Sequence, residues 1–164
     1  MLSKRRFLTS AAAALGCLTV AGCGREGASA APAAEAFEIT KTEAQWRASL
    51  SPQEFAVLRK ENTERPGASP LNEEHRRGTF VCAGCALPLY TSETKFESGT
   101  GWPSFTQPIA DAVRTRRDSG LLGIRTEVHC RRCGGHLGHV FKDGPPPTGL
   151  RYCMNGVAMH FIPA

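Results

Sequence analysis

"HCRRCGGHLGHVF", residues 129–141, contains two cysteines, Cys130 and Cys133, separated by two residues and followed by glycines. Another pair with the same spacing, Cys82 and Cys85, lies upstream, with 44 residues between the two pairs. Two such pairs on tight turns are typical of a tetrahedral four-sulfur zinc site. The sequence therefore predicts one zinc ion per chain, bound by these four cysteines.

The alternative use of the same thiols is two disulfide bonds, which an oxidising compartment would favour. A disulfide within either pair closes a loop of only two residues and adds little stability, whereas a metal joins two distant segments. A four-sulfur site leaves no open coordination position for a substrate. The zinc is therefore expected to be structural, and no organic cofactor is predicted.

The pattern around the cysteine pairs predicts a mainly β domain. Apolar and polar side chains alternate over residues 122–129, the period of a half-buried strand. Shorter strands are expected at 79–81, at 87–90 and in the C-terminal stretch, separated by turns rich in glycine and proline. The whole segment that folds is expected to span residues 37–164.

A short helical N-terminal arm is expected before the strands. One helix is predicted over residues 42–50 and a second from Ser51 to about Glu61. Serine at the cap, Pro52 at the first helical position and Glu54 three residues after the cap form a strong helix start. These signals place both helices ahead of the first cysteine pair.

Residues 1–23 have the features of an export signal: a basic start, an apolar run and a small-residue end. Residues 20–23 resemble a lipobox, which would place a lipid on Cys23 and anchor the protein to a membrane. Residues 3–8 resemble a twin-arginine signal, with Lys4 in place of the first arginine. Simple cleavage near residues 28–30 and general secretion remain the alternatives.

The leader also changes the charge balance. Residues 1–23 hold three basic and no acidic residues, so the rest of the chain has 17 basic and 15 acidic residues and a net charge of +2. That balance gives no reason to expect nucleic acid as a partner. Residues 24–36, rich in alanine and glycine, are expected to form a flexible tether. The sequence thus predicts an exported, periplasmic, membrane-anchored lipoprotein.

Cys153 stands alone in the C-terminal stretch. In an extended segment the side chains of Arg151, Cys153 and Asn155 point to one face. The guanidinium would favour the thiolate of Cys153, as nucleophilic chemistry at neutral pH requires. The alternative is an inert cysteine in a core strand, because Val157, Met159 and Phe161 continue the same alternation.

Two further features point to chemistry. His136 and His139, three residues apart, suit proton transfer once four sulfurs have saturated the zinc. Trp102 sits among glycines and before a proline, which suggests an aromatic ring held by a loop at a pocket. Each of these side chains, taken alone, could equally belong to the core or to a solvated surface.

Together these motifs resemble the B-type methionine sulfoxide reductases, which act on the R epimer. The resemblance covers about residues 40–164 and rests on seven ordered motifs. These are the two cysteine pairs, residues 101–105, residues 136–141, residues 144–149, Arg151-Tyr152-Cys153-x-Asn155 and residues 161–163. It implies two small antiparallel sheets, with the zinc away from the active site.

The resemblance also implies roles for individual residues. Cys153 would attack the sulfoxide sulfur, and His139, with His136 beside it, would supply or relay the proton. Arg151 would favour the thiolate and Asn155 would order the polar side of the site. Trp102 would receive the substrate methyl group, with Phe141 also counted among the substrate-binding residues. The substrate would be free methionine sulfoxide or an oxidised protein, and the product a cysteine sulfenic acid.

Many members of that family carry a second, resolving cysteine where this chain has Thr100. No other thiol remains once the zinc ligands and the leader are excluded. We therefore expect a thioredoxin-like protein or a small thiol to reduce the sulfenic acid directly or through a mixed disulfide. His160 also occupies a place where relatives often have a longer base.

Two other classes of protein fit part of the pattern. A zinc-ribbon binding module would explain the paired cysteines but not the Arg151, Cys153 and Asn155 triplet, and the leader places the chain away from nucleic acid. An exported zinc-binding thiol sensor or metal-buffering lipoprotein is the stronger alternative. Turnover of methionine sulfoxide separates these alternatives from the reductase.

Overall fold

The computed structural model describes residues 35–120 and 123–164. The predicted export signal and residues 24–34 of the predicted tether lie outside this range, so they stay predictions. Within the described ranges, no helix is long and apolar enough to cross a membrane.

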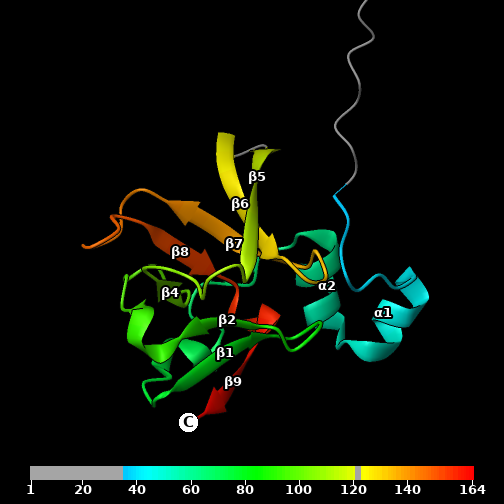
Figure 1. Ribbon diagram of the computed structural model, residues 1–164, viewed down its shortest axis with the longest axis horizontal. Coiled ribbons are helices and arrows are strands. Elements are labelled where there is room, and N and C mark those ends of the chain that lie inside the picture. Colours follow the sequence, from blue (N-terminus) through cyan, green and yellow to red (C-terminus); the bar gives the residue numbers. More distant parts are fainter. Residues whose placement is uncertain (1–34, 121–122) are drawn as a thin grey trace, which may run out of the picture. The chain divides into compact units, whose positions relative to one another are not determined.

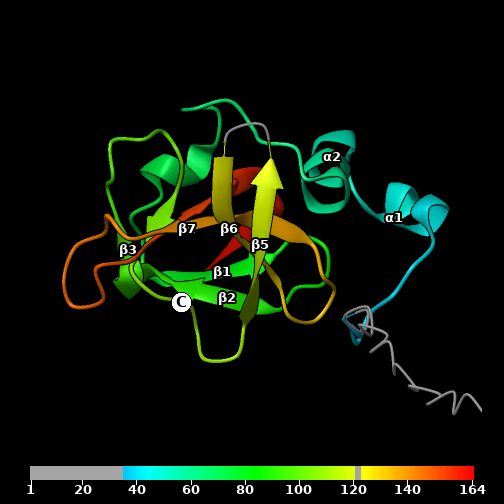
Figure 2. The same ribbon diagram turned by 90° about the horizontal axis from the view of Figure 1, so that it is seen from above.

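Two short helices open the fold, as predicted. Helix α1 spans Glu43–Ser49 and helix α2 spans Pro52–Lys60, and each begins with a capping box. In the second box, Ser51 and Glu54 satisfy each other's free amides, the reciprocal bonding expected from the sequence. The helices lie next to each other on one side of the domain (Figure 2) and bury Trp46, Phe55 and Leu58.

The rest of the chain forms two antiparallel sheets, which confirms the predicted mainly β class (Figure 1). The three-stranded sheet has the order β2-β1-β9, with bounds Pro88–Thr91, Gly78–Cys82 and Met159–Pro163. The other sheet has the order β3-β4-β8-β7-β6-β5. Its strands are β3 Lys95–Phe96, β4 Ser104–Phe105, β5 Val113–Gly120, β6 Gly123–Cys130, β7 His136–Phe141 and β8 Arg151–Met154. Three short 3₁₀ helices lie in the connections: η1 Pro70–Glu73 between α2 and β1, η2 Ser92–Thr94 between β2 and β3, and η3 Gly156–Ala158 between β8 and β9.

Aromatic rings join the two sheets. Tyr90 of β2 stacks on Phe105 of β4 with ring centroids 4.3 Å apart, and Phe80 of β1 meets the same ring at 4.9 Å. The Tyr90 hydroxyl donates to the sulfur of Met154 on β8. These four side chains are fully buried, so the core lies where the two sheets face each other.

The C-terminal stretch corrects one expectation. Val157, Met159 and Phe161 do not continue the face of Cys153, because the chain leaves β8, turns through η3 and enters β9 in the other sheet. The physical reason is a carboxylate: Glu64 accepts hydrogen bonds from the amides of Gly156 and Val157, which holds this segment in a turn. The C-terminal stretch therefore contributes one strand, β8, to the six-stranded sheet and another, β9, to the three-stranded sheet.

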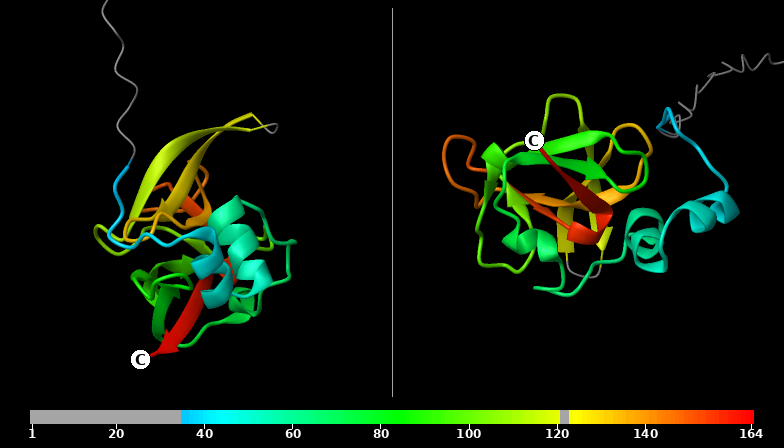
Figure 3. Two further views of the ribbon diagram at one scale, coloured as in Figure 1. Left: turned by 90° about the vertical axis from the view of Figure 1, so that its right-hand side faces the viewer. Right: turned by 90° about the horizontal axis from the view of Figure 1, so that it is seen from below.

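Strands β5 and β6 form a long hairpin that projects from the rest of the domain (Figure 3). The strands pair in continuous register from Val113 with Cys130 to Gly120 with Gly123. The base of the hairpin is buried at Val128, whereas Ile124 near its tip is 67% exposed. One end of β6 therefore belongs to the core and the other reaches into solvent.

Candidate active site and metal-binding cluster

The four predicted cysteines meet in one cluster. Their sulfur atoms all lie within 4.8 Å of one another, with Cys82 Sγ 3.8 Å from Cys133 Sγ and Cys85 Sγ 3.5 Å from Cys130 Sγ. A tetrahedral zinc site with Zn–S bonds of about 2.3 Å has sulfur–sulfur edges of about 3.8 Å, and a disulfide bond is far shorter. The donor set therefore fits a metal ion.

Two tight turns build the cluster. The first follows β1, where the Ala86 amide donates to the Cys82 carbonyl, and the second follows β6, where the Gly134 amide donates to the Cys130 carbonyl. The N-terminal arm covers the second turn, since Arg59 of α2 donates to the Cys133 carbonyl. One turn comes from each sheet, so a bound metal would join the sheets at this end.

Cys153 lies in the middle of the six-stranded sheet. Strand β8 runs between β4 and β7, and Cys153 stands opposite Ser104 on one neighbour and His139 on the other. Directly opposite residues share a face of the sheet. Strand β7 approaches closely because Gly138 has no side chain: a Cβ there would lie 2.2 Å from the Cys153 carbonyl oxygen. The glycine thus lets His139 stand beside the candidate nucleophile.

A chain of hydroxyl groups leads to the same thiol. Thr100 Oγ1 lies 3.8 Å from Cys153 Sγ, and Ser98 Oγ lies 2.8 Å from both Thr100 Oγ1 and Ser104 Oγ. Ser104 is fully buried. The structure therefore places a hydroxyl against the Cys153 sulfur, at the position where the sequence resemblance marks a missing cysteine.

Arg151 flanks Cys153 but also has a carboxylate partner. Its guanidinium donates two hydrogen bonds to Asp143, at 2.9 and 2.7 Å, and lies 4.5 Å from the centre of the Phe141 ring. Asp143 is the main cause that raises the pKa of Arg151, and the neighbouring Cys153 thiol also raises it. The sequence predicts that the positive charge of Arg151 acts on the Cys153 thiolate alone. In the structure the Asp143 carboxylate shares that charge.

His139 contacts a carboxylate on the projecting hairpin. Its Nε2 lies 2.8 Å from Oδ2 of Asp118, which also pairs with Arg125. Burial lowers the pKa of His139 below its usual value, and the hydrogen bond to Asp118 offsets this only in part. The imidazolium of His139 is therefore a stronger acid than an exposed one.

His136 belongs to a buried ionic network. Its Nδ1 lies 2.8 Å from Oε1 of Glu127, which is also an ion-pair partner of Arg116. Burial raises the pKa of Glu127, but His136, Arg116 and His129 together outweigh it and lower that pKa. The ring centroids of His136 and His139 are 5.4 Å apart. Within the described residues, His136 Nε2 is buried without a hydrogen-bond partner.

Asn155 and Trp102 are held by backbone groups. The buried Asn155 amide donates to the Leu137 carbonyl and accepts a hydrogen bond from the amide of Glu64. The Trp102 indole donates to the carbonyl of the same Glu64, at 3.2 Å. Asn155 therefore lies past the end of β8 and fastens β7 to the segment around Glu64, rather than simply repeating the face of Cys153.

Four acidic residues near these side chains were missed by sequence reasoning: Glu64, Asp118, Glu127 and Asp143. Glu127 occupies a polar position in the predicted half-buried strand, where the alternation predicts an exposed side chain, but the structure buries it. The contact of Asp118 depends on the register of the hairpin, and that of Glu64 spans 92 residues. Only Asp143 carried a local signal, because it lies eight residues before Arg151 in a turn rich in glycine and proline.

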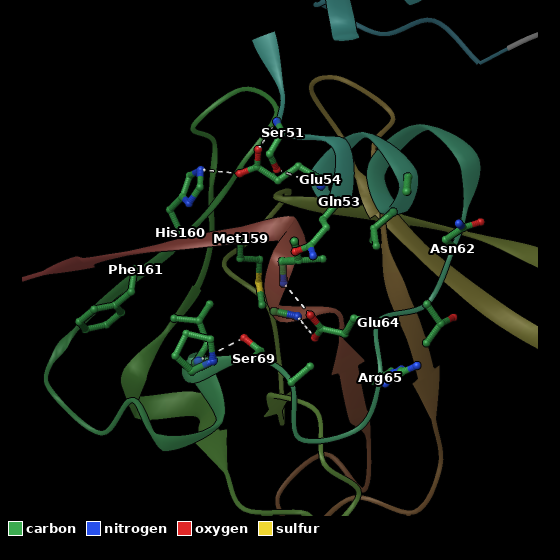
Figure 4. Close-up of a pocket in the computed structure, with 18 residues that line it drawn as sticks. Ser51, Gln53, Glu54, Asn62, Glu64, Arg65, Ser69, Met159, His160 and Phe161 are labelled. Atoms are coloured by element: carbon green, nitrogen blue, oxygen red, sulfur yellow. Dashed lines mark hydrogen bonds and ion pairs between the residues drawn. The ribbon is translucent and has the colours of Figure 1, made fainter. Parts of the chain in front are cut away.

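Two hollows of the described residues lie near the segments that carry these side chains. A shallow one of about 440 Å³ is lined by Ser98, Thr100, Asp143 and Arg151, next to Cys153. A larger one of about 640 Å³ lies among α2, η1, η3 and β9 and includes Glu64 in its wall (Figure 4). The larger hollow contains none of the predicted catalytic side chains, whereas the smaller one includes Arg151 and Thr100, whose hydroxyl lies against the Cys153 sulfur.

Comparison with known proteins defines the class. A family model for the SelR domain matches residues 50–163. A peptide methionine sulfoxide reductase MsrB of Bradyrhizobium diazoefficiens is 54% identical over 127 residues, covering 77% of this chain and 91% of that protein. The MsrB of Thiobacillus denitrificans is 52% identical over 124 residues, covering 75% and 94%. The chain therefore belongs to the SelR domain family.

The enzyme class follows from this membership. The chain is a peptide methionine sulfoxide reductase, an oxidoreductase. Among solved structures, the Mis18 "Yippee-like" domain aligns with 54% of this chain and 98% of its own, at 16% identity and a TM-score of 0.45. That likeness is too low to support any functional comparison.

The environment of His139 gives a measurable prediction. NMR titration should place the pKa of its imidazole below the ordinary value of about 6.5, because burial disfavours the charged form. The substitution Asp118→Asn should lower this pKa further, since it removes a carboxylate that stabilises the imidazolium. Asp143→Asn is the matched control, because that carboxylate bonds Arg151 instead. A rise in the His139 pKa in Asp118→Asn would contradict this account.

Proposed function

We propose that this enzyme reduces the R epimer of methionine sulfoxide, free or protein-bound, by direct attack of Cys153 on the sulfoxide sulfur. The observation that supports this role most strongly is the position of Cys153. Its thiol lies in a central strand, opposite His139 and flanked by Arg151. A nucleophile beside an acid–base group and a fixed positive charge is the arrangement that thiol chemistry needs.

The reaction balances with one thiol. The Cys153 thiolate forms a bond to the sulfoxide sulfur while the sulfoxide oxygen takes a proton. The oxygen then passes to the sulfur of Cys153, the sulfur–sulfur bond breaks, and methionine leaves. The products are methionine and Cys153 sulfenic acid. Two electrons have moved from the cysteine sulfur to the substrate, so the enzyme must be reduced before the next turnover.

The neighbouring residues have distinct roles in this proposal. His139, with its lowered pKa and its hydrogen bond to Asp118, donates or relays the proton to the sulfoxide oxygen. Arg151 stabilises the thiolate electrostatically. The Trp102 ring receives the methyl group of the substrate, and Phe141 packs against Arg151 at the edge of the site.

Reduction of the sulfenic acid requires a thiol from outside the chain. The other cysteines of the described residues lie together in the metal-binding cluster, and Thr100 places a hydroxyl against Cys153. A thioredoxin-like dithiol protein, or two molecules of a small thiol, supplies two electrons and two protons and is left as a disulfide. It releases the oxygen as water and regenerates Cys153, either directly or through a mixed disulfide.

The metal in the cysteine cluster is proposed to be zinc, with a structural role. Four sulfurs at tetrahedral spacing suit zinc and leave no position for a substrate. The four cysteines would hold the ion at the junction of the two sheets. Its contribution is to stability, and the proposed chemistry proceeds at Cys153.

The assay that tests the proposed function uses separated R and S methionine sulfoxides with dithiothreitol as reductant. We expect turnover of the R epimer, little or none of the S epimer, and loss of at least about a thousandfold in kcat/KM for Cys153→Ser, as for the removal of other nucleophiles. Oxidised protein serves as a second substrate. Equal turnover by the Cys153→Ser variant would rule out the proposed nucleophile.

Intact-mass spectrometry tests the single-thiol cycle. After one equivalent of sulfoxide and no reductant, the enzyme should gain the mass of one oxygen atom. Thr100→Cys should instead lose two hydrogens, because a sulfur at the position of Thr100 Oγ1 would lie close enough to attack the sulfenic acid. Thr106→Cys, at the position directly after β4, where the threonine hydroxyl donates to the Thr94 carbonyl, is the control. Loss of two hydrogens by the parent enzyme would contradict the proposal.

Metal analysis tests the zinc assignment. The purified enzyme should contain about one zinc ion per chain, and Cys130→Ser should lose the metal and lower the thermal midpoint by at least about 10 °C. Cys153→Ser should keep both the metal and the midpoint, which separates the two kinds of cysteine. A Cys130→Ser variant with full zinc content would contradict the four-cysteine site.

A further inference from the structure

Glu64 joins the candidate active site to the turn that follows it. This residue lies in the connection between α2 and η1, about 90 residues before the C-terminal strands. Three of its groups, the carboxylate, the amide and the carbonyl, make hydrogen bonds to other segments. No other residue of the connection touches both Trp102 and Asn155 among the hydrogen bonds of the described residues.

We infer that Glu64 is a positioning residue for sulfoxide reduction, whose carboxylate fixes its own backbone so that this backbone can orient Trp102 and Asn155. The inference rests on the proposed function for the role of these two side chains in the site. It adds a residue that, among the hydrogen bonds and ion pairs of the described residues, has none to Cys153, His136 or His139. The contacts support it in three steps.

The first step is the anchoring of the carboxylate. Its two oxygens accept hydrogen bonds from the amides of Gly156 and Val157 at the start of η3, the second at 3.1 Å. Figure 4 shows the Glu64 side chain reaching these amides from the wall of the larger hollow. The carboxylate is not paired with a basic side chain of the described residues, so backbone amides are its partners. Each such bond stabilises the position of the charged group.

The backbone of Glu64 makes a hydrogen bond to each of the two site residues. The Glu64 amide donates to Oδ1 of Asn155 at 3.0 Å, and the Glu64 carbonyl accepts from the Trp102 indole at 3.2 Å. The two site residues come from different parts of the chain, Trp102 from the loop before β4 and Asn155 from the position after β8. Residue 64 therefore sets the distance between the aromatic and the polar side of the site.

Other contacts hold residues 67–72, the part of the connection that follows Glu64. The amide of Gly67 donates to the Gly101 carbonyl at 2.7 Å, and the Asn72 side chain donates to the same carbonyl. A Cβ at Gly156 would lie 1.9 Å from Ser69 Oγ, so this part of the connection is packed directly on η3. These contacts retain residues 67–72 without the Glu64 carboxylate. Loss of that carboxylate should therefore loosen residue 64 locally while the fold persists.

The test compares Glu64→Gln and Glu64→Ala with Glu54→Gln in the full chain. Glutamine has nearly the shape of glutamate, but it offers one acceptor oxygen and turns an NH₂ group toward the other amide. Glu54 lines the same hollow and caps α2, a role that glutamine also fills. The control thus removes the same charge from the same hollow without touching the bonds of Glu64.

Two readouts are measured. In Glu64→Gln the KM for the R sulfoxide should rise about tenfold with a smaller fall in kcat, since one lost hydrogen bond to a charged group loosens substrate binding. In ¹⁵N–¹H spectra the Trp102 indole signal, assigned with Trp102→Phe, should shift in both Glu64 variants, with the larger change in Glu64→Ala. The indole of Trp46, in helix α1, should stay in place, as should both signals in Glu54→Gln.

The outcomes separate the inference from the proposed function. An unmoved Trp102 signal in Glu64→Gln overturns the positioning role, whatever the kinetics show. A shifted signal with unchanged KM and kcat means that Glu64 does position Trp102 but that the ring does not bind substrate, which contradicts the proposed role of Trp102. If both indole signals of Glu64→Gln moved to the chemical shifts of an unfolded chain, the inference would also be overturned, because Glu64 would then support the whole fold.

Discussion

Four sulfur atoms meet where the two sheets come together, and this junction fixes the turns that follow β1 and β6 and the start of β7. One cysteine pair follows β1 of the three-stranded sheet and the other follows β6 of the six-stranded sheet. The second turn also sets where β7 begins, so it fixes the start of the strand that carries His136 and His139. The turn with Cys130 and Cys133 thus helps to set the position of His139, which lies opposite Cys153.

Acidic side chains are the second organising element. Asp118, Glu127 and Asp143 each contact one of the basic groups near Cys153, namely His139, His136 and Arg151. The charge of the site therefore depends on three separate pairs, each contributed by a different part of the chain. Their lowered pKa values keep the carboxylates ionised near neutral pH, so the basic groups operate beside fixed negative charges.

The features that were predictable from the sequence are local ones. The spacing of the cysteines and the capping box at Ser51 each depend on a few neighbouring residues, and the structure has both. The alternation over residues 122–129 predicted a strand, which β6 forms, but not its burial. Ile124 is exposed and Glu127 and His129 are buried, because burial here follows the distance from the base of the hairpin. The break between β8 and β9 was missed because the alternating pattern runs through Val157 without interruption. Only a carboxylate from residue 64 shows why the chain turns there. Asp118 was missed for a similar reason, since its partner becomes visible only with the register of the hairpin.

The projecting β5–β6 hairpin has a consequence for how the enzyme loses activity. Asp118, which holds His139, lies in the outer half of this hairpin, where side chains are more exposed than at its base. Segments with few buried apolar contacts open at lower free energy than the core. Mild heating or low denaturant should therefore separate Asp118 from His139 while both sheets remain intact. The enzyme would then become inactive through sub-global opening, at a temperature below that of its cooperative unfolding.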